Sequence, residues 1–448
     1  MVNNGDFIYN ICGATMTQGF ETRQIHAGQV PDSETGARTV PIYQTTSFVF
    51  RDAEHAANLF ALAEIGNIYT RIANPTTSVL EARLSDLEGG TATAVGLPGA
   101  LCVASGQAAT TLAITNICDA GDHIVTASAL YGGTYNLFNY TLPKMGIEVT
   151  FVKDADDLDE WRAAVQPNTK LFYGETVGNP KNNCIDIEGV STVAHNAGIP
   201  LILDNTVPSP YLINPLKWGA DILIESTTKF IGGHGTSIGG VIIDGGNFDF
   251  GDAEKFPGMN NPDPSYNGLA FWPALGAGSY IIKARVQGLR DLGAAMSPTN
   301  AFHFIQGCET LSLRMERHCQ NAQIVAEFLD GHDKVESVQY AGLPSSPWHE
   351  RMAKYTEGRG FCSVPAFIIK GGREAGEKFV NATELHSHVA NIGDVRSLII
   401  HPGSTTHSQL NEAEQLASGV APGLIRLSVG LETIGDIIAD LELGFSAV

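Results

Sequence analysis

Basic residues are scarce in this sequence. Its 448 residues include 27 Lys and Arg against 48 Asp and Glu, which leaves a formal net charge of −21. A sequence-independent nucleic-acid binder needs clustered Lys and Arg, and so does a protein that docks on an anionic membrane. The composition therefore argues against nucleic-acid and membrane partners. Charged residues make up only 17% and apolar residues 43%, so we expect a large buried core rather than global disorder.

Long apolar segments and cysteine motifs are also lacking. The longest uncharged run, Gly89 to Cys118, contains a proline and five glycines, which suits a packed interior better than lipid. The first basic residue is Arg23, so we expect neither a secretory signal nor a transit peptide. The seven cysteines are scattered and form no CxxC pair, which is typical of reduced thiols. These absences predict a cytoplasmic protein.

Short apolar runs alternate with helix-length segments between residues 100 and 245. Apolar runs without polar alternation indicate strands that are covered on both faces, so this stretch predicts an α/β domain with a mostly parallel sheet. The seven expected strands are Leu101–Ser105, His123–Ala127, Glu148–Val152, Lys170–Glu175, Leu201–Asp204, Ile222–Glu225 and Val241–Asp244. Ligands of such sheets bind at the carboxyl ends of the strands.

The flanking regions have other patterns. Residues 1–17 are polar and predict a loose arm, and residues 18–75 predict extended chain laid over another surface. A helix is expected from Thr76, and a longer helix over Cys308–Asp330 leads into a last domain. That domain should contain strands at Gly360–Ile369, Ser397–His401 and Leu424–Val429, and a closing helix at Thr433–Leu443. The predicted organisation is an arm over 1–75, a main domain over 76–300 and a C-terminal domain over 301–448.

The sharpest chemical signal is the segment Glu225-Ser-Thr-Thr-Lys229-Phe-Ile-Gly-Gly-His-Gly235. A lysine at the end of a buried strand is partly desolvated, which favours the free amine that reacts with an aldehyde cofactor. The hydroxyls of Ser226 and Thr228 could hold a phosphate. The spacing alone is equally compatible with an ordinary lysine at a strand exit.

Two other segments favour the functional interpretation. Asp204 ends another buried strand, and a buried carboxylate needs a cationic partner such as a protonated pyridine nitrogen. Ser105-Gly106-Gln107 opens a helix directly after a strand, and backbone N–H groups at a helix N-terminus bind phosphate. An Asp that caps a turn, or an ordinary strand-to-helix turn, would look the same in isolation.

Together these segments resemble the Cys/Met-metabolism group of fold-type I enzymes that depend on pyridoxal phosphate (PLP), over nearly the whole chain. The other matching segments are Ile68-Tyr69-Thr-Arg71, Leu130-Tyr131-Gly-Gly-Thr, Glu175-Thr-Val-Gly-Asn179-Pro and Ile425-Arg426-Leu-Ser. The resemblance implies an α/β, fold-type I PLP-dependent transferase. Its PLP domain should hold a mostly parallel seven-stranded sheet, followed by a smaller C-terminal α/β domain.

The resemblance also implies roles for single residues. Lys229, Tyr131 and Asp204 are the implied catalytic residues. The implied cofactor-binding residues are Tyr69, Arg71, Ser105, Gly106, Gln107, Tyr131, Asn179, Asp204, Ser226, Thr228 and Lys229. The implied substrate-binding residues are Tyr69, Asn179, Ser397 and Arg426. No metal is expected, because the pairs His386/His388 and His401/His407 lack Cys or carboxylate partners at metal-binding spacing.

Details within the family point to the subgroup that replaces the acetate of O-acetyl-L-homoserine with sulfide or methanethiol. They are Gly132–Phe138, Ala390–Ser397, His401–His407 and a long insertion at about 246–290. The family forms homotetramers as dimers of dimers, in which Tyr69 and Arg71 would serve the neighbouring subunit's site.

Two alternatives stay open at this stage. One is a methionine or cystathionine γ-lyase of the same family. Methionine γ-lyases typically have Cys where Gly133 stands, and cystathionine-processing relatives often have Glu where Arg396 stands. The other is a catalytically idle PLP-fold binding protein, against which the intact Lys229, Asp204 and Arg426 argue.

Overall fold

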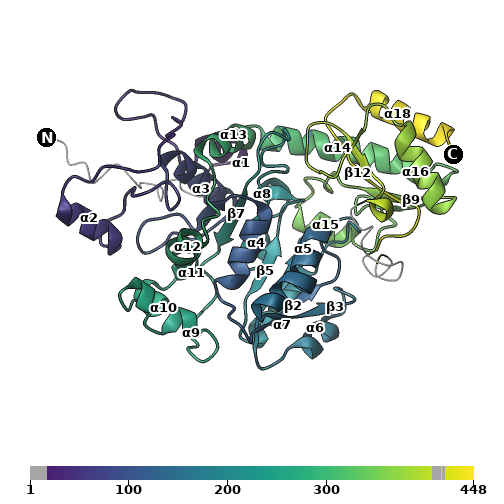
Figure 1. Cartoon of the computed structure of the whole chain (residues 1–448). Coiled ribbons are helices and arrows are strands. Elements are labelled where there is room, and N and C mark those ends of the chain that lie inside the picture. Colours follow the sequence, from purple (N-terminus) through teal and green to yellow (C-terminus); the bar gives the residue numbers. More distant parts are fainter. Residues whose placement is uncertain (1–17, 406–414, 416–418) are drawn as a thin grey trace. The chain divides into compact units, whose positions relative to one another are not determined.

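The computed structural model describes residues 18–405, 415 and 419–448. The described residues, drawn in Figure 1 with colours that follow the sequence, divide into two compact units. The first unit runs to Asp119 and also includes Ala220–Gly232 and Thr236–Thr310, whereas the second comprises Ala120–Gly219, Gly233–Gly235 and the described part of Leu311–Val448. The loose arm expected over 1–17 lies outside the described residues. The three-part division at residues 75 and 300 stays a prediction.

The larger sheet has seven strands within the described residues, in the order β1-β7-β6-β5-β4-β2-β3. They are β1 (Ala100–Val103), β2 (His123–Ala127), β3 (Glu148–Val152), β4 (Thr169–Glu175), β5 (Leu201–Asp204), β6 (Ile222–Glu225) and β7 (Gly240–Asp244). In the second unit β2 pairs in parallel with β3 and β4, and β4 pairs in parallel with β5. In the first unit β7 runs antiparallel to β1 and β6. The predicted mostly parallel seven-stranded sheet is confirmed.

The helix over Pro75–Glu88 of the first unit begins at a side-chain cap and ends at a glycine. Asn74 accepts the N–H of Thr76 at 2.9 Å, and Gly89 ends the same helix in the left-handed region at φ 81°. The helix predicted from Thr76 therefore exists and begins at Pro75. The α-helices of this unit are α1 (Phe20–His26), α2 (Ala53–Phe60), α3 (Pro75–Glu88), α4 (Gly106–Thr115), α9 (Pro257–Asn260), α10 (Phe271–Leu275), α11 (Ser279–Lys283), α12 (Arg290–Leu292) and α13 (Pro298–Cys308).

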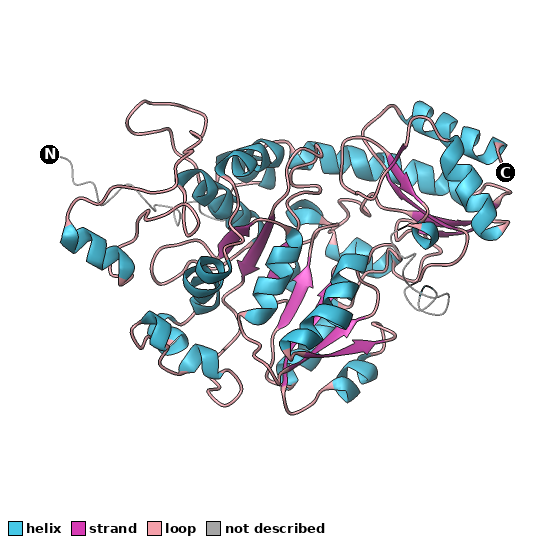
Figure 2. Cartoon of the chain, viewed as in Figure 1, coloured by secondary structure: helices cyan, strands magenta, loops and turns pink. Residues whose placement is uncertain are grey.

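The second unit adds a smaller sheet with the strand order β10-β11-β12-β9-β8, as predicted for a C-terminal α/β domain. Figure 2 shows helices beside the strands of this sheet. Its strands are β8 (Val335–Gln339), β9 (Ala366–Ile369), β10 (Ser387–His388), β11 (Leu398–Ile400) and β12 (Leu424–Ser428). The described α-helices of the whole second unit are α5 (Gly132–Asn136), α6 (Leu158–Ala164), α7 (Ile187–Asn196), α8 (Ser209–Leu212), α14 (Leu311–Asp330), α15 (His349–Tyr355), α16 (Gly372–Ala382) and α18 (Ile434–Ser446). Phe367, Phe379 and Phe445 are central to the core between this sheet and its helices.

The helix predicted over Cys308–Asp330 is wrong at its start. Cys308 is the last residue of α13, and α14 begins at Leu311. Gly307 lies so close to the Ile231 carbonyl oxygen that an added Cβ would be 2.3 Å away, so the end of α13 is pressed against another segment. In the described part of the chain, no helix is long and apolar enough to cross a membrane.

Candidate active site

The Ser105-Gly106-Gln107 turn lies between β1 and α4 in the first unit. Ser105 is extended at φ −164°, and its Oγ accepts the N–H of Ala108 at 3.0 Å, which caps α4. Gly106 is the first residue of that helix. A Cβ at Gly106 would lie 2.8 Å from the Cβ of Ser226, so no other side chain fits there. The turn thus presents bare backbone at a helix N-terminus, beside the segment that leads to Lys229.

The Lys229 segment leaves β6 directly after Glu225. The N–H of Lys229 donates to the carbonyl of Ser226 at 3.1 Å, and the lysine is half-buried. Thr228 anchors the segment, because its hydroxyl donates to the Gly239 carbonyl at 3.2 Å and accepts the Gly239 N–H at 3.1 Å. This hydroxyl is therefore already bonded, and its contact with a phosphate stays a prediction, as does that of Ser226.

Tyr69 and Arg71 lie on the surface of the first unit. The Tyr69 ring is 41% exposed, and the Arg71 guanidinium lies 5.5 Å from its centroid. Arg71 also donates to the carbonyl of Arg290. An exposed tyrosine beside a half-buried arginine is suited to a site outside their own chain, but the role of the two residues in a neighbouring subunit stays a prediction.

In the second unit, Glu175 and Asp204 end β4 and β5 and are register partners. Asp204 accepts the N–H of Thr206 at 2.9 Å, and burial raises its pKa. Within the described residues no cationic side chain pairs with Asp204. A half-buried carboxyl that lacks a cation suits a protonated pyridine nitrogen.

Glu175 belongs to one of the sequence motifs, but the motif assigns it no role. Its two carboxylate oxygens accept the N–H of Tyr131 at 2.5 Å and that of Asn179 at 3.3 Å. Burial, and next the charge of Asp204, raise its pKa. Glu175 therefore fixes the backbone of two predicted site residues. Its position at the end of a buried strand, like that of Asp204, was the available signal. The Tyr131 side chain itself is 49% exposed.

Arg426 is the most buried cation of the predicted site. It lies on β12 with 7% exposure, and burial lowers its pKa to about 10. Nη1 donates to Oδ1 of Asn179 at 3.2 Å and Nη2 donates to the carbonyl of Asn391 at 2.9 Å. Its Nε finds no hydrogen-bond partner, and no carboxylate pairs with the guanidinium, in the part of the chain that the structure describes. An arginine in this state is prepared for an anionic ligand.

Ser397 and Arg396 have partners of their own. The Ser397 hydroxyl donates to Glu432 at 2.9 Å and accepts the N–H of Gly430 at 2.9 Å, so its predicted contact with substrate stays a prediction. Arg396 is exposed and pairs with Asp394 at 2.9 Å. Among the described residues no group of three or more His, Cys, Asp or Glu could hold a metal ion, and His407 lies outside them.

Residues 21–446 match the family described as Cys/Met metabolism PLP-dependent enzymes. The chain belongs to this family. It is 55% identical over 440 residues to O-acetyl-L-homoserine sulfhydrylase of Leptospira meyeri, covering 96% of this chain and 98% of the relative. It is 52% identical over 439 residues to the enzyme of that name from Corynebacterium glutamicum, covering 96% and 97% of the two chains.

A solved structure agrees with this assignment. The fold is similar to a putative O-acetylhomoserine (thiol)-lyase from Campylobacter jejuni with a TM-score of 0.91 and 38% identity, covering 96% of this chain and 100% of the other. That protein is described with N'-pyridoxyl-lysine-5'-monophosphate. The predicted family, fold-type I architecture and PLP dependence are confirmed.

The residues present fit the family's cofactor. Asp204 is a carboxyl that lacks a cationic partner within the described residues, and Gly106 leaves backbone exposed at the start of α4. Lys229 offers an amine at the exit of β6. A pyridinium nitrogen, a phosphate and an aldehyde carbon are the three groups that these features suit.

Proposed function

We propose that this enzyme replaces the acetate of O-acetyl-L-homoserine with sulfide and releases L-homocysteine and acetate, a step of methionine biosynthesis. The buried guanidinium of Arg426, which has no anion of its own among the described residues, carries the proposal. It suits the α-carboxylate of an amino-acid substrate. The names of the two relatives at 55% and 52% identity support the choice of O-acetyl-L-homoserine and sulfide.

The roles of single residues follow from their chemistry. PLP supplies the electron sink that acidifies the substrate's Cα proton. Lys229 takes that proton as the base, and Asp204 holds the proton on the pyridine nitrogen. Arg426 holds the α-carboxylate, and its bond to Asn179 sets the orientation of the guanidinium. At Cγ the bond to the acetate oxygen breaks and a bond to sulfur forms, and Tyr131 handles protons near this carbon.

The proposal includes an assembly and a location. We infer a homotetramer, built as a dimer of dimers, in which Tyr69 and Arg71 complete the neighbouring subunit's site. The exposed Tyr69 ring and its cation–π contact with Arg71 support this inference. The enzyme would act in the cytoplasm on small molecules, without nucleic acid or membrane partners, as its net charge of −21 also favours.

Product analysis tests the proposed reaction. Purified enzyme is supplied with O-acetyl-, O-succinyl- or O-phosphohomoserine, each with sulfide or methanethiol, and kcat/KM is measured for every pair. The same buffer is used for cleavage of cystathionine and methionine. We expect O-acetylhomoserine with sulfide to be preferred by at least about tenfold, a difference of about 1.4 kcal/mol in transition-state binding. Equal or faster cleavage of methionine or cystathionine would instead assign the chain to the γ-lyases.

A further inference from the structure

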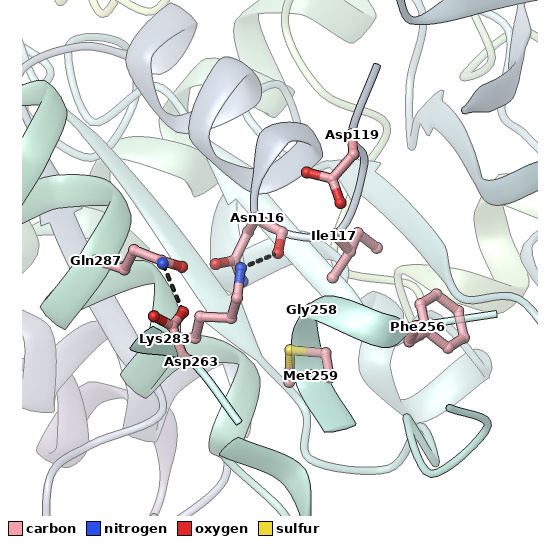
Figure 3. Close-up of a pocket in the computed structure, with 9 residues that line it drawn as sticks. All are labelled: Asn116, Ile117, Asp119, Phe256, Gly258, Met259, Asp263, Lys283 and Gln287. Atoms are coloured by element: carbon pink, nitrogen blue, oxygen red, sulfur yellow. Dashed lines mark hydrogen bonds between the residues drawn. The ribbon is translucent and has the colours of Figure 1, made fainter. Parts of the chain in front are cut away.

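The insertion at residues 246–290 builds a cavity in the first unit. Phe256, Met259, Asp263, Lys283 and Gln287 of this segment line it, together with the chain that follows α4. The cavity has a volume of about 210 Å³. Figure 3 shows the side chains that line it. None of the predicted site residues lines it.

Lys283 gives the cavity a buried cation. Lys283 is only 8% exposed, and its Nζ donates to the carbonyl of Asn116 at 2.6 Å. An ammonium group has three N–H donors, and within the described residues only this one acceptor is present. Capping the end of α4 therefore explains one hydrogen bond of Lys283 and leaves two donors beside the cavity (Figure 3).

Acceptors of opposite charge line the same cavity. Asp263 accepts the side-chain N–H of Gln287 at 2.7 Å, and Asp119 also lines the wall. Both carboxylates are close enough to raise the pKa of Lys283 against the larger, lowering effect of burial. A simple anion would be repelled by the two carboxylates, and a simple cation by Lys283. A ligand that carries both charges on neighbouring atoms meets both needs.

Part of the wall is apolar, beside the polar side chains of Asn116 and Gln287, and the volume limits the ligand. Phe256 and Met259 are 2% and 1% exposed, and Ile117 completes this side. An apolar cavity of about 150 Å³ holds benzene, which has six non-hydrogen atoms, so about 210 Å³ holds roughly eight. The carboxylate, the ammonium nitrogen and Cα of an α-amino acid account for five of the eight non-hydrogen atoms. About three remain for the side chain.

We propose that this cavity binds the zwitterion of a free α-amino acid with an unbranched apolar side chain of about three non-hydrogen atoms. The α-carboxylate accepts hydrogen bonds from Lys283, and the ammonium group donates to Asp263 and Asp119. The side chain lies against Phe256 and Met259. This site is additional to the one that carries Arg426, and it needs no cofactor.

L-Norvaline, which has eight non-hydrogen atoms, is the probe. Equilibrium dialysis of the labelled amino acid against the PLP-loaded enzyme should find two sites per chain, since the active site also accepts amino acids. The cofactor absorbance, on the order of 420 nm for PLP bound to lysine, reports the active site alone. Pentanoate and butylamine, which each lack one of the two charges, should fill the second site at least about tenfold less tightly.

Two variants decide whether the second site is this cavity. Lys283→Met keeps the length of the side chain and removes the charge. Gly258→Leu fills the space, because a Cβ at Gly258 would meet only the end of Lys283, at 3.9 Å. Each should abolish one equivalent of norvaline binding and leave the absorbance response unchanged, whereas the exposed Lys144→Met should keep both sites.

If Lys283→Met fails to fold, Gly258→Leu gives the answer alone. A single norvaline site in the unmodified enzyme, or two sites that persist in Gly258→Leu, would overturn the proposal. Butylamine or pentanoate binding as tightly as norvaline would also overturn it, since only one of the two charges would then be recognised.

Discussion

Arg426 and Asn179 are 247 residues apart in the sequence, yet Nη1 of the arginine donates to Oδ1 of the asparagine at 3.2 Å. Asn179 is itself held through its backbone by Glu175, at 3.3 Å. The guanidinium is therefore oriented by a turn that β4 positions, and not by its own strand alone. Both of its other groups, Nη2 and Nε, are fixed in direction before any substrate arrives.

Arg426→Lys tests this fixed orientation. Lysine keeps the charge but loses the fork, so two charge-assisted hydrogen bonds to the substrate carboxylate are weakened, at about 1.5 kcal/mol each. We expect kcat/KM for O-acetylhomoserine to fall about 100-fold, with little change in the KM for sulfide. Arg359→Lys is the matched control, because Arg359 donates to the Tyr211 carbonyl outside the site. A loss below threefold would contradict the assigned role.

Lys229→Ala separates covalent attachment of PLP from its retention. The turn at Gly106 remains, so the variant should still bind PLP, but borohydride reduction should no longer fix it to the chain. Turnover should fall by about 10⁴-fold or more, since the proposed base at Cα is lost. Mass spectrometry after reduction measures the label, and the exposed Lys153→Ala is the control. Wild-type activity in Lys229→Ala would eliminate this lysine as the base.

Mixing two inactive variants tests whether the site is shared between chains. Arg71→Ala should weaken PLP retention, and Lys229→Ala should abolish turnover. In a shared site, a mixed dimer has one site with neither lesion. After subunit exchange at equal amounts, about one quarter of wild-type activity should return, because half the dimers are mixed and each has one intact site in two. Persisting inactivity despite proven exchange would argue for sites built within one chain.

Asp244 predicts a pH dependence of stability. It ends β7, is 3% exposed and has a pKa raised to about 6 by burial. A raised carboxyl pKa means that the folded state holds the proton more tightly. Its stabilising contribution is therefore present below about pH 4 and is lost as the pH rises through about 6. The difference between a pKa of about 6 and the ordinary value of 3.8 corresponds to about 3 kcal/mol.

Asp244→Asn should remove this dependence. Asparagine keeps an acceptor for the Gly246 N–H, which lies 2.8 Å from Asp244 Oδ1, and carries no charge. Relative to wild type, the urea midpoint of the PLP-free variant should rise between about pH 4.5 and about pH 7.5. The exposed Asp436→Asn serves as control. A variant-minus-wild-type difference that is the same at both pH values would show that Asp244 does not titrate in this range.

The sequence predicts best what is buried on both faces. β2, β5 and β6 have the predicted bounds, and almost all of their residues are buried. β3 also has its predicted bounds, although four of its five residues are exposed or half-buried. β8 carries exposed residues too, and the sequence does not predict a strand over Val335–Gln339. The pattern of apolar and polar residues gives only a weak signal for a partly exposed strand at the edge of a sheet.

Hydrogen bonds between residues far apart in the chain could not be predicted from local sequence. Glu175 accepts the N–H of Tyr131, 44 residues away, and Ser397 donates to Glu432, 35 residues away. The motifs indicate which residues we expect near cofactor and substrate, but not the contacts that these carboxylates make with them from other elements. Glu175 is itself the first residue of the Glu175–Asn179 motif, yet the motif does not reveal its bond to Tyr131. The cavity beside Lys283 is of the same kind, since α4 and the insertion meet only in the folded chain.

The contact between Gly106 and Ser226 fixes a distance. With only 2.8 Å between a Cβ at residue 106 and that of Ser226, the start of α4 cannot slide along its axis without moving the turn that carries Lys229. The spacing between the start of α4, where we propose that the phosphate binds, and the segment that carries Lys229 is thus set by main-chain packing rather than by flexible side chains. We therefore expect the site to discriminate by the length between the aldehyde and the phosphate of its cofactor, so that a shorter or longer aldehyde phosphate reacts poorly with Lys229.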